Sequence, residues 1–140
     1  MNTHQNELII IRGIPGSGKS TFAKTFEGYV HLEADQYFMK DGIYQFNPKL
    51  LGKAHKWCQE TCRQALLEGK NVVVSNTFTT HKEILPYQNI AVELNIVMRI
   101  WKCVGEFENV HGVPQEALQR MKDRWQDVDT EDVYNPLDNP

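Results

Sequence analysis

The sequence predicts an α/β fold of three layers, in which helices cover both faces of a parallel sheet of about four strands. Four short apolar runs alternate with longer segments of helical pattern along the 140 residues, and strands separated by helices are typical of this fold class. The run Val72-Val73-Val74 has no polar alternation, as expected for a strand that is buried on both faces of a sheet. The expected strands are Leu8–Arg12, Tyr29–Glu33, Asn71–Ser75 and Asn95–Trp101.

The first expected strand leads directly into a glycine-rich loop with the spacing of a phosphate-binding loop. Glycines let the backbone turn its N–H groups inward toward phosphate oxygens, and the helix that follows offers its positive end to the same anion. We expect this loop to bind ATP, with Lys19 on the β- and γ-phosphates and the Ser20 hydroxyl on Mg²⁺. The expected ATP-binding residues are Gly13, Ile14, Pro15, Gly16, Ser17, Gly18, Lys19, Ser20 and Thr21.

Capping residues mark the ends of the expected helices. Gly28 ends the helix after the loop, and Asn47-Pro48 begins a long helix that stops at Gly69. Thr80 and Glu83 have the spacing of a capping box for the next helix. Val113-Pro114 begins the last helix.

Composition indicates one domain over residues 1–126, followed by an acidic tail at 127–140. The hydrophobic share of 41% and the charged share of 24% are ordinary for a globular protein. The chain has 18 acids and 15 bases, and without the five acids of the tail it has 13 and 15, a net charge of about +2. We expect the tail to fray or lie on the surface. A mildly basic body is compatible with a phosphate-bearing substrate.

Membrane and disulfide-stabilised classes are disfavoured. No apolar run approaches the roughly 20 residues that span a bilayer, and residues 1–7 lack a signal-peptide pattern, so we expect a cytoplasmic protein without a membrane partner. Three cysteines argue against a disulfide framework. Cys58 and Cys62, with His55 one turn earlier, have a spacing that a metal site could use, but core packing is the expected role.

Polar residues follow the second and third strands, at the edge of a parallel sheet where ligands bind. Asp35 is either the carboxylate that takes the proton of a substrate hydroxyl or a helix N-cap. Asp35 and Ser20 are the expected metal ligands. We expect Glu33 to point the other way along its strand. Asn76 stands where many phosphate-loop enzymes carry an Asp for Mg²⁺.

The C-terminal part of the domain carries the candidates for a lid and for a cation. The segment at 106–114 is expected to be a mobile lid, and phosphoryl transfer usually needs a cation beyond the γ-phosphate. Arg120 and Arg124 lie one turn apart, so both could face the cleft or both could belong to a solvated helix face, which suits Arg124 better. Arg120 is the expected catalytic cation. A separate stripe of Lys49, Lys53 and Lys56 fits either a nucleic-acid backbone or a solvated face.

Five motifs stand in order along the chain: the loop at 13–20, the turn at Asp35, the segment Asp41–Pro48, the residues Ser75-Asn76-Thr77, and His111–Pro114. From Leu8 to Trp125 this set resembles the P-loop kinase-like ATP-binding proteins of the AAA type that are related to the 5′-polynucleotide kinase domain. The resemblance implies a nucleotide-kinase-like P-loop NTPase fold with ATP and Mg²⁺ at the loop and a small helical lid. In the polynucleotide kinases the carboxylate that matches Asp35 activates the 5′-hydroxyl.

Three positions depart from that family pattern. Phe38 stands where those kinases carry an arginine for the incoming strand, and Asn76 replaces the acid of the third strand. Glu108, followed by Asn109, places an acid where those kinases carry a lid arginine before an asparagine. Three functions are therefore compared: a kinase for the 5′-hydroxyl of a polynucleotide, a kinase for a nucleoside or sugar, and an ATP-binding regulatory module with little catalysis. The sequence sets no oligomeric state.

Overall fold

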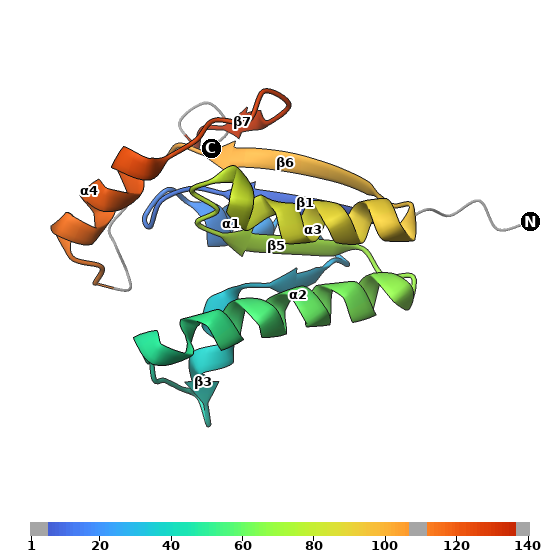
Figure 1. Ribbon diagram of the computed structural model, residues 1–140, viewed down its shortest axis with the longest axis horizontal. Coiled ribbons are helices and arrows are strands. Elements are labelled where there is room, and N and C mark those ends of the chain that lie inside the picture. Colours follow the sequence, from blue (N-terminus) through green and yellow to red (C-terminus); the bar gives the residue numbers. More distant parts are fainter. Residues whose placement is uncertain (1–5, 107–111, 137–140) are drawn as a thin grey trace, which may run out of the picture.

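The computed structural model describes residues 6–106 and 112–136, which form a parallel sheet with helices on both faces (Figure 1). The sheet has five strands in the order β2-β5-β1-β6-β7, and every neighbouring pair is parallel. The strands are β1 (Glu7–Arg12), β2 (Val30–Leu32), β5 (Val72–Asn76), β6 (Val97–Cys103) and β7 (Asp132–Tyr134). The four expected strands are confirmed to within two residues at each end, and β7 adds a fifth that was not expected.

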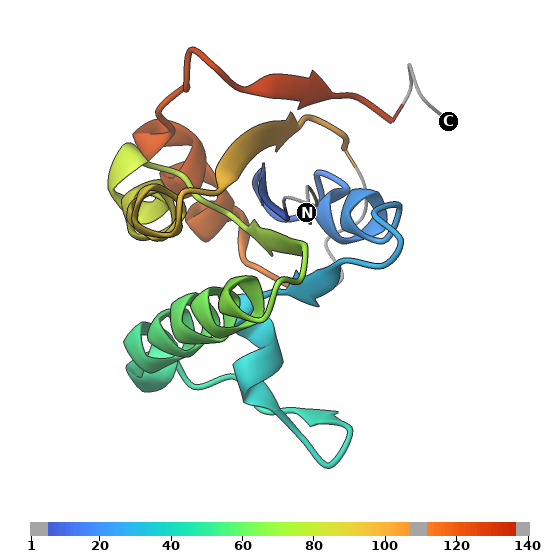
Figure 2. The same ribbon diagram turned by 90° about the vertical axis from the view of Figure 1, so that its right-hand side faces the viewer.

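Helices pack on the two faces as the fold class requires. Helix α1 (Lys19–Ala23) lies on one face, and α2 (Leu51–Leu67) and α3 (His81–Leu94) lie on the other (Figure 2). A short hairpin of β3 (Met39–Lys40) and β4 (Ile43–Tyr44) stands apart from the sheet, between the 3₁₀ turns η1 (Ala34–Phe38) and η2 (Pro48–Leu50). Helix α4 (Gln115–Arg124) lies beyond the carboxyl ends of the strands, on the same side as the phosphate loop (Figure 1). The three-layer α/β/α fold is confirmed.

Burial on both faces explains why the central strand is apolar throughout. Leu8 and Ile10 pack against the α2 and α3 side, whereas Ile9 and Ile11 pack against the α1 side. All four side chains are fully buried. Successive residues of a strand point to opposite faces, so a strand with helices above and below needs apolar residues at every position.

Most of the expected capping residues are found at the helix ends. The Asn47 side chain accepts a hydrogen bond from the backbone of Lys49 at 3.0 Å, and η2 continues into α2. Thr80 and Glu83 form the capping box at the start of α3. Gly69 has a φ of +82° directly after the end of α2, the left-handed conformation that stops a helix. Gly28 has the same φ, but α1 ends at Ala23 with Lys24 as its C-cap, so the expectation that Gly28 ends this helix is wrong.

Over its described part the acidic tail lies largely at the surface, which agrees with one of the two expectations from the sequence, and it does not fray, which corrects the other. Residues 132–134 pair in parallel with residues 101–103 of β6. The ring of Tyr134 stacks on Phe22 of α1, with 4.0 Å between ring centroids. Carboxylates of the tail meet cations of the body, since Asp127 lies 3.1 Å from Lys102 and Glu131 lies 2.7 Å from Arg12.

Arg12 is a fully buried arginine at the end of β1. Its guanidinium donates to the carbonyls of Phe78 and Gln126 at 2.7–2.9 Å and forms the ion pair with Glu131. It also lies 4.0 Å from the centre of the Trp125 ring. A buried charge is tolerated only when it is paired and hydrogen-bonded, so Arg12 ties the central strand to the C-terminal segment.

Replacing Arg12 with Met should lower the free energy of unfolding by about 3–5 kcal/mol, because the Glu131 carboxylate would remain buried without its partner. Urea titration followed by circular dichroism measures the change. The exposed Arg63–Glu93 pair supplies the control, and Arg63→Ala should barely move the midpoint. Adding Glu131→Met to Arg12→Met should recover part of the loss. Equal midpoints for Arg12→Met and Arg63→Ala would contradict this account.

Candidate active site

The phosphate loop follows β1 at the carboxyl edge of the sheet and has the backbone that its glycines allow. Gly16 and Gly18 have φ of +87° and +97°, a region that side chains other than glycine rarely adopt. Gly13 is needed for space, since a Cβ there would lie 2.3 Å from Ser17 Oγ and 3.0 Å from the carbonyl oxygen of Cys103. The loop is closed by a hydrogen bond from the Ser17 backbone to Ile14, at 3.1 Å.

Lys19 lies at the start of α1 and folds back over the loop. Its ammonium donates to the carbonyl of Ile14 at 3.1 Å. Burial lowers the pKa of Lys19 below its usual value, and the nearby Cys103, Glu33 and Asp35 partly oppose that shift. The ammonium of Lys19 is poorly solvated, and its anionic neighbours only partly compensate for this. The negative charge of a phosphate chain would stabilise it further.

The loop has polar groups that fit a phosphate ligand. Ser17 Oγ is buried and has no hydrogen-bond partner among the described residues, and a buried polar group in that state is costly unless a ligand satisfies it. The first N–H groups of α1 have no acceptor within their own helix. These residues fit the phosphates of ATP in the way that the sequence predicts.

Glu33 is a site residue that the sequence interpretation missed. It faces the loop rather than away from it, and its carboxylate accepts a hydrogen bond from the Ser20 hydroxyl at 2.6 Å. Strand β2 ends at Leu32 and Glu33 is the N-cap of η1, so the alternation of side chains along a strand does not apply to Glu33 and Asp35. While Ser20 donates its proton to Glu33, its lone pairs are available to a cation.

The charge of Glu33 is favoured by its neighbours. Burial alone would raise the pKa of Glu33, but the His31 and Ser20 contacts and the charge of Lys19 outweigh it, so the pKa lies below the usual 4.5. Oxygen ligands of this kind suit Mg²⁺, which typically binds through one or two protein groups together with substrate phosphates. Ser20, with Glu33 behind it, would hold such an ion. In the described part of the chain, no cluster of three or more His, Cys, Asp or Glu could hold a metal by itself.

Asp35 lies in η1, directly after β2, and accepts a hydrogen bond from the Tyr44 hydroxyl at 3.2 Å. The alternative role of Asp35 as an N-cap is wrong, because η1 begins at Ala34 and its N-cap is Glu33. The carboxylate is close enough to Lys19 to act on the pKa of that ammonium. A carboxylate therefore stands beside the phosphate loop, where an acceptor hydroxyl would have to approach.

Two of the departures from the family pattern are structural. Asn76 accepts a hydrogen bond from the Ala34 backbone at 2.8 Å, and its amide faces Cys58 Sγ at 3.9 Å, so it joins the ends of β5 and β2. Phe38 is buried against Ala54 and does not line the site. The third departure is Glu108. Residues 107–111 of the expected lid, which include Glu108, are outside the described residues.

The two arginines of α4 have different surroundings. Arg124 Nε donates to Thr79 Oγ1 at 2.9 Å, which fastens the end of α4 to the loop after β5. Arg120 lies one turn earlier and is exposed. The side chain of Arg120 makes no hydrogen bond or ion pair with any described residue. Its catalytic role stays a prediction.

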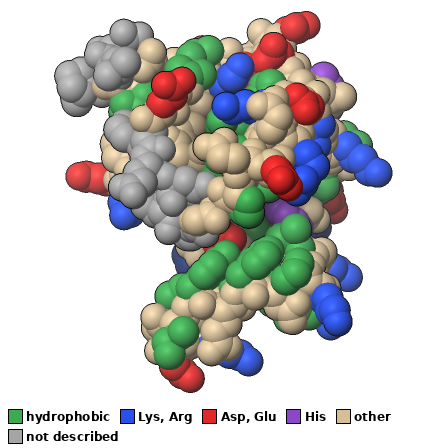
Figure 3. All heavy atoms as spheres, turned by 90° about the vertical axis from the view of Figure 1, so that its left-hand side faces the viewer, with side chains coloured by type: hydrophobic (Ala, Val, Ile, Leu, Met, Phe, Trp, Pro, Cys, Tyr) green, Lys and Arg blue, Asp and Glu red, His purple; other side chains and the backbone are tan. Residues whose placement is uncertain are grey.

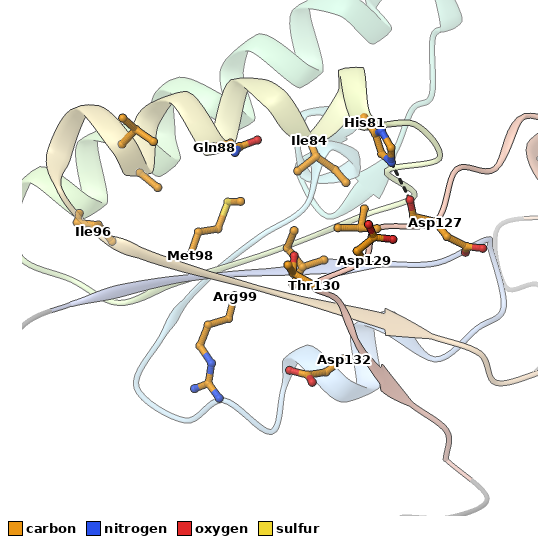
Figure 4. A pocket seen from close by; sticks show the side chains of 14 residues that line it. His81, Ile84, Gln88, Ile96, Met98, Arg99, Asp127, Asp129, Thr130 and Asp132 are labelled. Carbon is orange, nitrogen blue, oxygen red and sulfur yellow. Dashed lines mark hydrogen bonds between the residues drawn. The ribbon is translucent and has the colours of Figure 1, made fainter.

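A separate cavity of about 660 Å³ lies between α3, β6 and the segment that leads into β7 (Figure 4). Its lining is mixed, with Ile84, Met98 and Ile100 beside Asp129 and Asp132. None of the expected site residues lines it, so it is not the candidate active site.

The remaining sequence candidates are placed as follows. Cys58 and Cys62 lie on the buried face of α2, and burial raises the pKa of the Cys62 thiol to about 12. Lys49, Lys53 and Lys56 are exposed. No helix in the described ranges is both long and apolar enough to cross a membrane.

Residues 8–106 match a family described as an AAA domain. The chain belongs to this family. It is 32% identical over 133 residues to human NEDD4-binding protein 2, with 85% of this chain matched to 8% of that protein. It is 33% identical over 94 residues to the protein named "Putative bifunctional polynucleotide phosphatase/kinase" from Acanthamoeba polyphaga mimivirus, with 65% of this chain matched to 19% of that protein. The chain thus spans only a small part of both relatives.

Solved kinase structures share the fold of this AAA domain. A "putative kinase" from Chloroflexus aurantiacus superposes with a TM-score of 0.74 at 16% identity, covering 96% of this chain and 87% of that one. A gluconokinase from Sinorhizobium meliloti has a TM-score of 0.62 at 14% identity, covering 94% and 84%. The P-loop kinase-like fold that the sequence predicts is confirmed.

Changing Gly13 to Ala should weaken ATP binding by about tenfold or more, because overpacking against Ser17 and Cys103 would displace the loop. Isothermal titration calorimetry with ATP and Mg²⁺ measures this. Gly52→Ala is the matched control, since nothing lies within 4 Å of a Cβ at that helical position, and it should leave ATP affinity unchanged. Tight binding by Gly13→Ala would show that the loop is not the ATP site.

Changing Glu33 to Gln should raise the Mg²⁺ concentration needed for tight ATP binding, while Glu27→Gln, an exposed control, should not. The stability that Glu33 contributes has a defined pH range because its pKa is lowered in the folded state. That contribution is complete above the usual 4.5 and is lost as the pH falls through the folded pKa. Unfolding curves of the wild type and Glu33→Gln should therefore converge at acid pH. If the difference in stability between the wild type and Glu33→Gln were the same at every pH, the Glu33 carboxylate would not contribute the stability described here.

Proposed function

We propose that this AAA domain is an ATP-dependent kinase that transfers the γ-phosphoryl group to a hydroxyl, and that the acceptor is the 5′-hydroxyl of a polynucleotide. The observation that carries the proposal is the hydrogen bond of 2.6 Å from the Ser20 hydroxyl to Glu33, which brings the start of η1 to the phosphate loop. Asp35 lies two residues after Glu33 and Lys19 lies one residue before Ser20, so a phosphate held by the lysine would lie near the Asp35 carboxylate. This is the arrangement that phosphoryl transfer to a hydroxyl requires.

Each residue has a distinct role in the proposed reaction. The loop and Lys19 hold the phosphates of ATP, and Ser20 with Glu33 would hold Mg²⁺, which supplies positive charge to the phosphates when bound. Asp35 orients the acceptor hydroxyl and takes its proton as the new O–P bond forms and the bond to the β-phosphate oxygen breaks. Arg120 is the proposed cation on the transferred group, from the helix that lies beyond the loop.

A polynucleotide acceptor is supported by one of the relatives and by local charge. The mimivirus relative is named as a polynucleotide phosphatase/kinase. Residues 36–57, which follow Asp35, contain four lysines and one acid in a chain of net charge −3. A basic surface beside the acceptor carboxylate favours a polyanion.

A kinase for a small hydroxyl compound is the second candidate. The gluconokinase shares the fold over nearly its whole length, with 84% of that chain covered, whereas the polynucleotide relative is matched over 19%. The two candidates differ in the acceptor and agree on the roles of Lys19 and Asp35.

Label transfer from γ-labelled ATP to 5′-hydroxyl DNA and RNA oligonucleotides tests the proposal. Asp35→Asn should lower kcat by about 10²- to 10⁴-fold and leave ATP affinity within about twofold. Lys19→Ala should abolish transfer. Asp41→Asn is the matched control, because it makes the same change on the exposed turn of the nearby hairpin, and it should keep full activity.

The outcomes separate the three functions. Phosphoryl transfer to oligonucleotides by the wild type that is lost in Lys19→Ala and strongly reduced in Asp35→Asn establishes the polynucleotide kinase. Transfer only to nucleosides or sugars favours the small-molecule kinase. Tight ATP binding with negligible turnover on every acceptor would contradict the kinase proposal and indicate a nucleotide-binding module.

A further inference from the structure

The segment after Asp35, from η1 through the hairpin to Phe46, carries aromatic side chains on its surface. Tyr37, Tyr44 and Phe46 are 37%, 38% and 50% exposed, and together they are here termed the aromatic face. Figure 3 views the molecule from the carboxyl edge of the sheet and shows hydrophobic side chains gathered on the lower lobe, which α2 and the hairpin form. Exposed aromatic groups that gather in this way mark an interaction site more often than a structural surface.

Packing beneath the aromatic face holds its rings in place. Phe46 meets the buried Phe38 edge to face, with 5.1 Å between centroids. The rings of Tyr44 and Phe46 are nearly parallel, at 16° and 6.4 Å. The ring centroid of Tyr37 lies 6.1 Å from that of Trp57 in α2. Rings that are supported from below but exposed above lose little freedom when a flat group stacks on them.

The aromatic face is joined to the acceptor carboxylate by one hydrogen bond. Tyr44 donates its hydroxyl to Asp35 at 3.2 Å. Burial, with the charge of Asp35 and this hydrogen bond, raises the pKa of Tyr44 to about 12, so the phenol remains a donor at neutral pH. A ligand on the Tyr44 ring would therefore lie next to the group that takes the acceptor proton.

The same segment is basic. Lys40 lies on β3, and Lys49, Lys53 and Lys56 follow on η2 and α2, with Asp41 the one acid between residues 36 and 57. Exposed aromatic rings among lysines are the combination with which proteins bind single-stranded nucleic acid, since rings stack on bases and lysines meet phosphates.

We propose that the aromatic face is the subsite that stacks the terminal base of a single-stranded nucleic-acid acceptor, placing its 5′-hydroxyl at Asp35. This rests on the proposed function and deepens it by naming how the acceptor is held. Every base has a π face, so the subsite accepts all sequences and requires an unpaired end. Tyr44 serves as a positioning residue, because it links the stacked base to the carboxylate. The lysines hold the phosphates that follow.

Phe46→Leu and Phe46→Trp test the subsite directly. Leucine keeps the apolar bulk but removes the ring, so the Kd for a fluorescent 5′-hydroxyl single strand should rise about tenfold, whereas Trp should retain or improve binding. Fluorescence anisotropy measures the Kd without requiring turnover. Ile43→Ala is the matched control, an exposed aliphatic residue of the same hairpin, and should leave the Kd unchanged. Thermal melting of each variant verifies that it is folded.

Tyr44→Phe tests the link to Asp35. This change keeps the ring and removes the hydroxyl, so the oligonucleotide Kd and KM should stay within about twofold while kcat falls. If Tyr44 had a merely structural role, Tyr44→Phe would instead lower the melting temperature and would not lower kcat selectively while KM stays unchanged. A blunt duplex should bind more weakly than the single strand in the wild type.

Failure of the subsite and failure of the kinase proposal give different results. Oligonucleotide binding that depends on the Phe46 ring, without any transfer, overturns the kinase and leaves the subsite. Transfer with the same Kd in wild type and Phe46→Leu overturns the subsite and leaves the kinase. Equal weakening by Phe46→Leu and Ile43→Ala would indicate an apolar docking surface for a protein and also overturn the subsite.

Discussion

Arg12 lies at the end of the central strand, one residue before the phosphate loop, with its guanidinium wholly removed from solvent. Its partners come from two distant segments, the loop after β5 at Phe78 and the C-terminal segment at Gln126 and Glu131. Since an unpaired buried charge would cost several kcal/mol, these segments are held around the base of the phosphate loop. Arg12 thus connects the start of the phosphate loop with the loop after β5 and with the segment between α4 and β7.

The consequence is a site whose charged groups stand on fixed elements. Lys19 begins a helix, Glu33 is the N-cap of η1 directly after β2, and Asp35 lies within η1. The Asn76 side chain fastens that turn to β5 through Ala34. Preorganised charges of this kind need no rearrangement when the phosphoryl group is transferred. The aromatic face extends the same rigid turn outward, so acceptor binding and proton removal would share one support.

Local patterns carried most of what could be predicted. The phosphate loop is a contiguous motif with glycine spacing that few other structures require, and the capping residues of α2 and α3 act within one turn. The strand β7 was missed because it is short, exposed and paired with a distant edge. The sequence did contain a signal that the end of β1 contacts the C-terminal segment. Arg12 is a lone charge at the end of an apolar strand, and the tail carries acids that could pair with it. Glu33 was assigned to the wrong face because it was treated as a strand residue, whereas it is the N-cap of η1. The mutual approach of Asp35, Tyr44 and Lys19 depends on tertiary packing and has no local signature.

The central claim is that the γ-phosphate of ATP and an acceptor hydroxyl meet between Lys19 and Asp35. A crystal structure with a non-hydrolysable ATP analogue, Mg²⁺ and a short 5′-hydroxyl oligonucleotide tests this most directly. The account predicts the terminal phosphate on Lys19 and the 5′-hydroxyl within about 3 Å of an Asp35 oxygen. A nucleotide bound outside the phosphate loop, or a 5′ end bound away from Asp35, would contradict it.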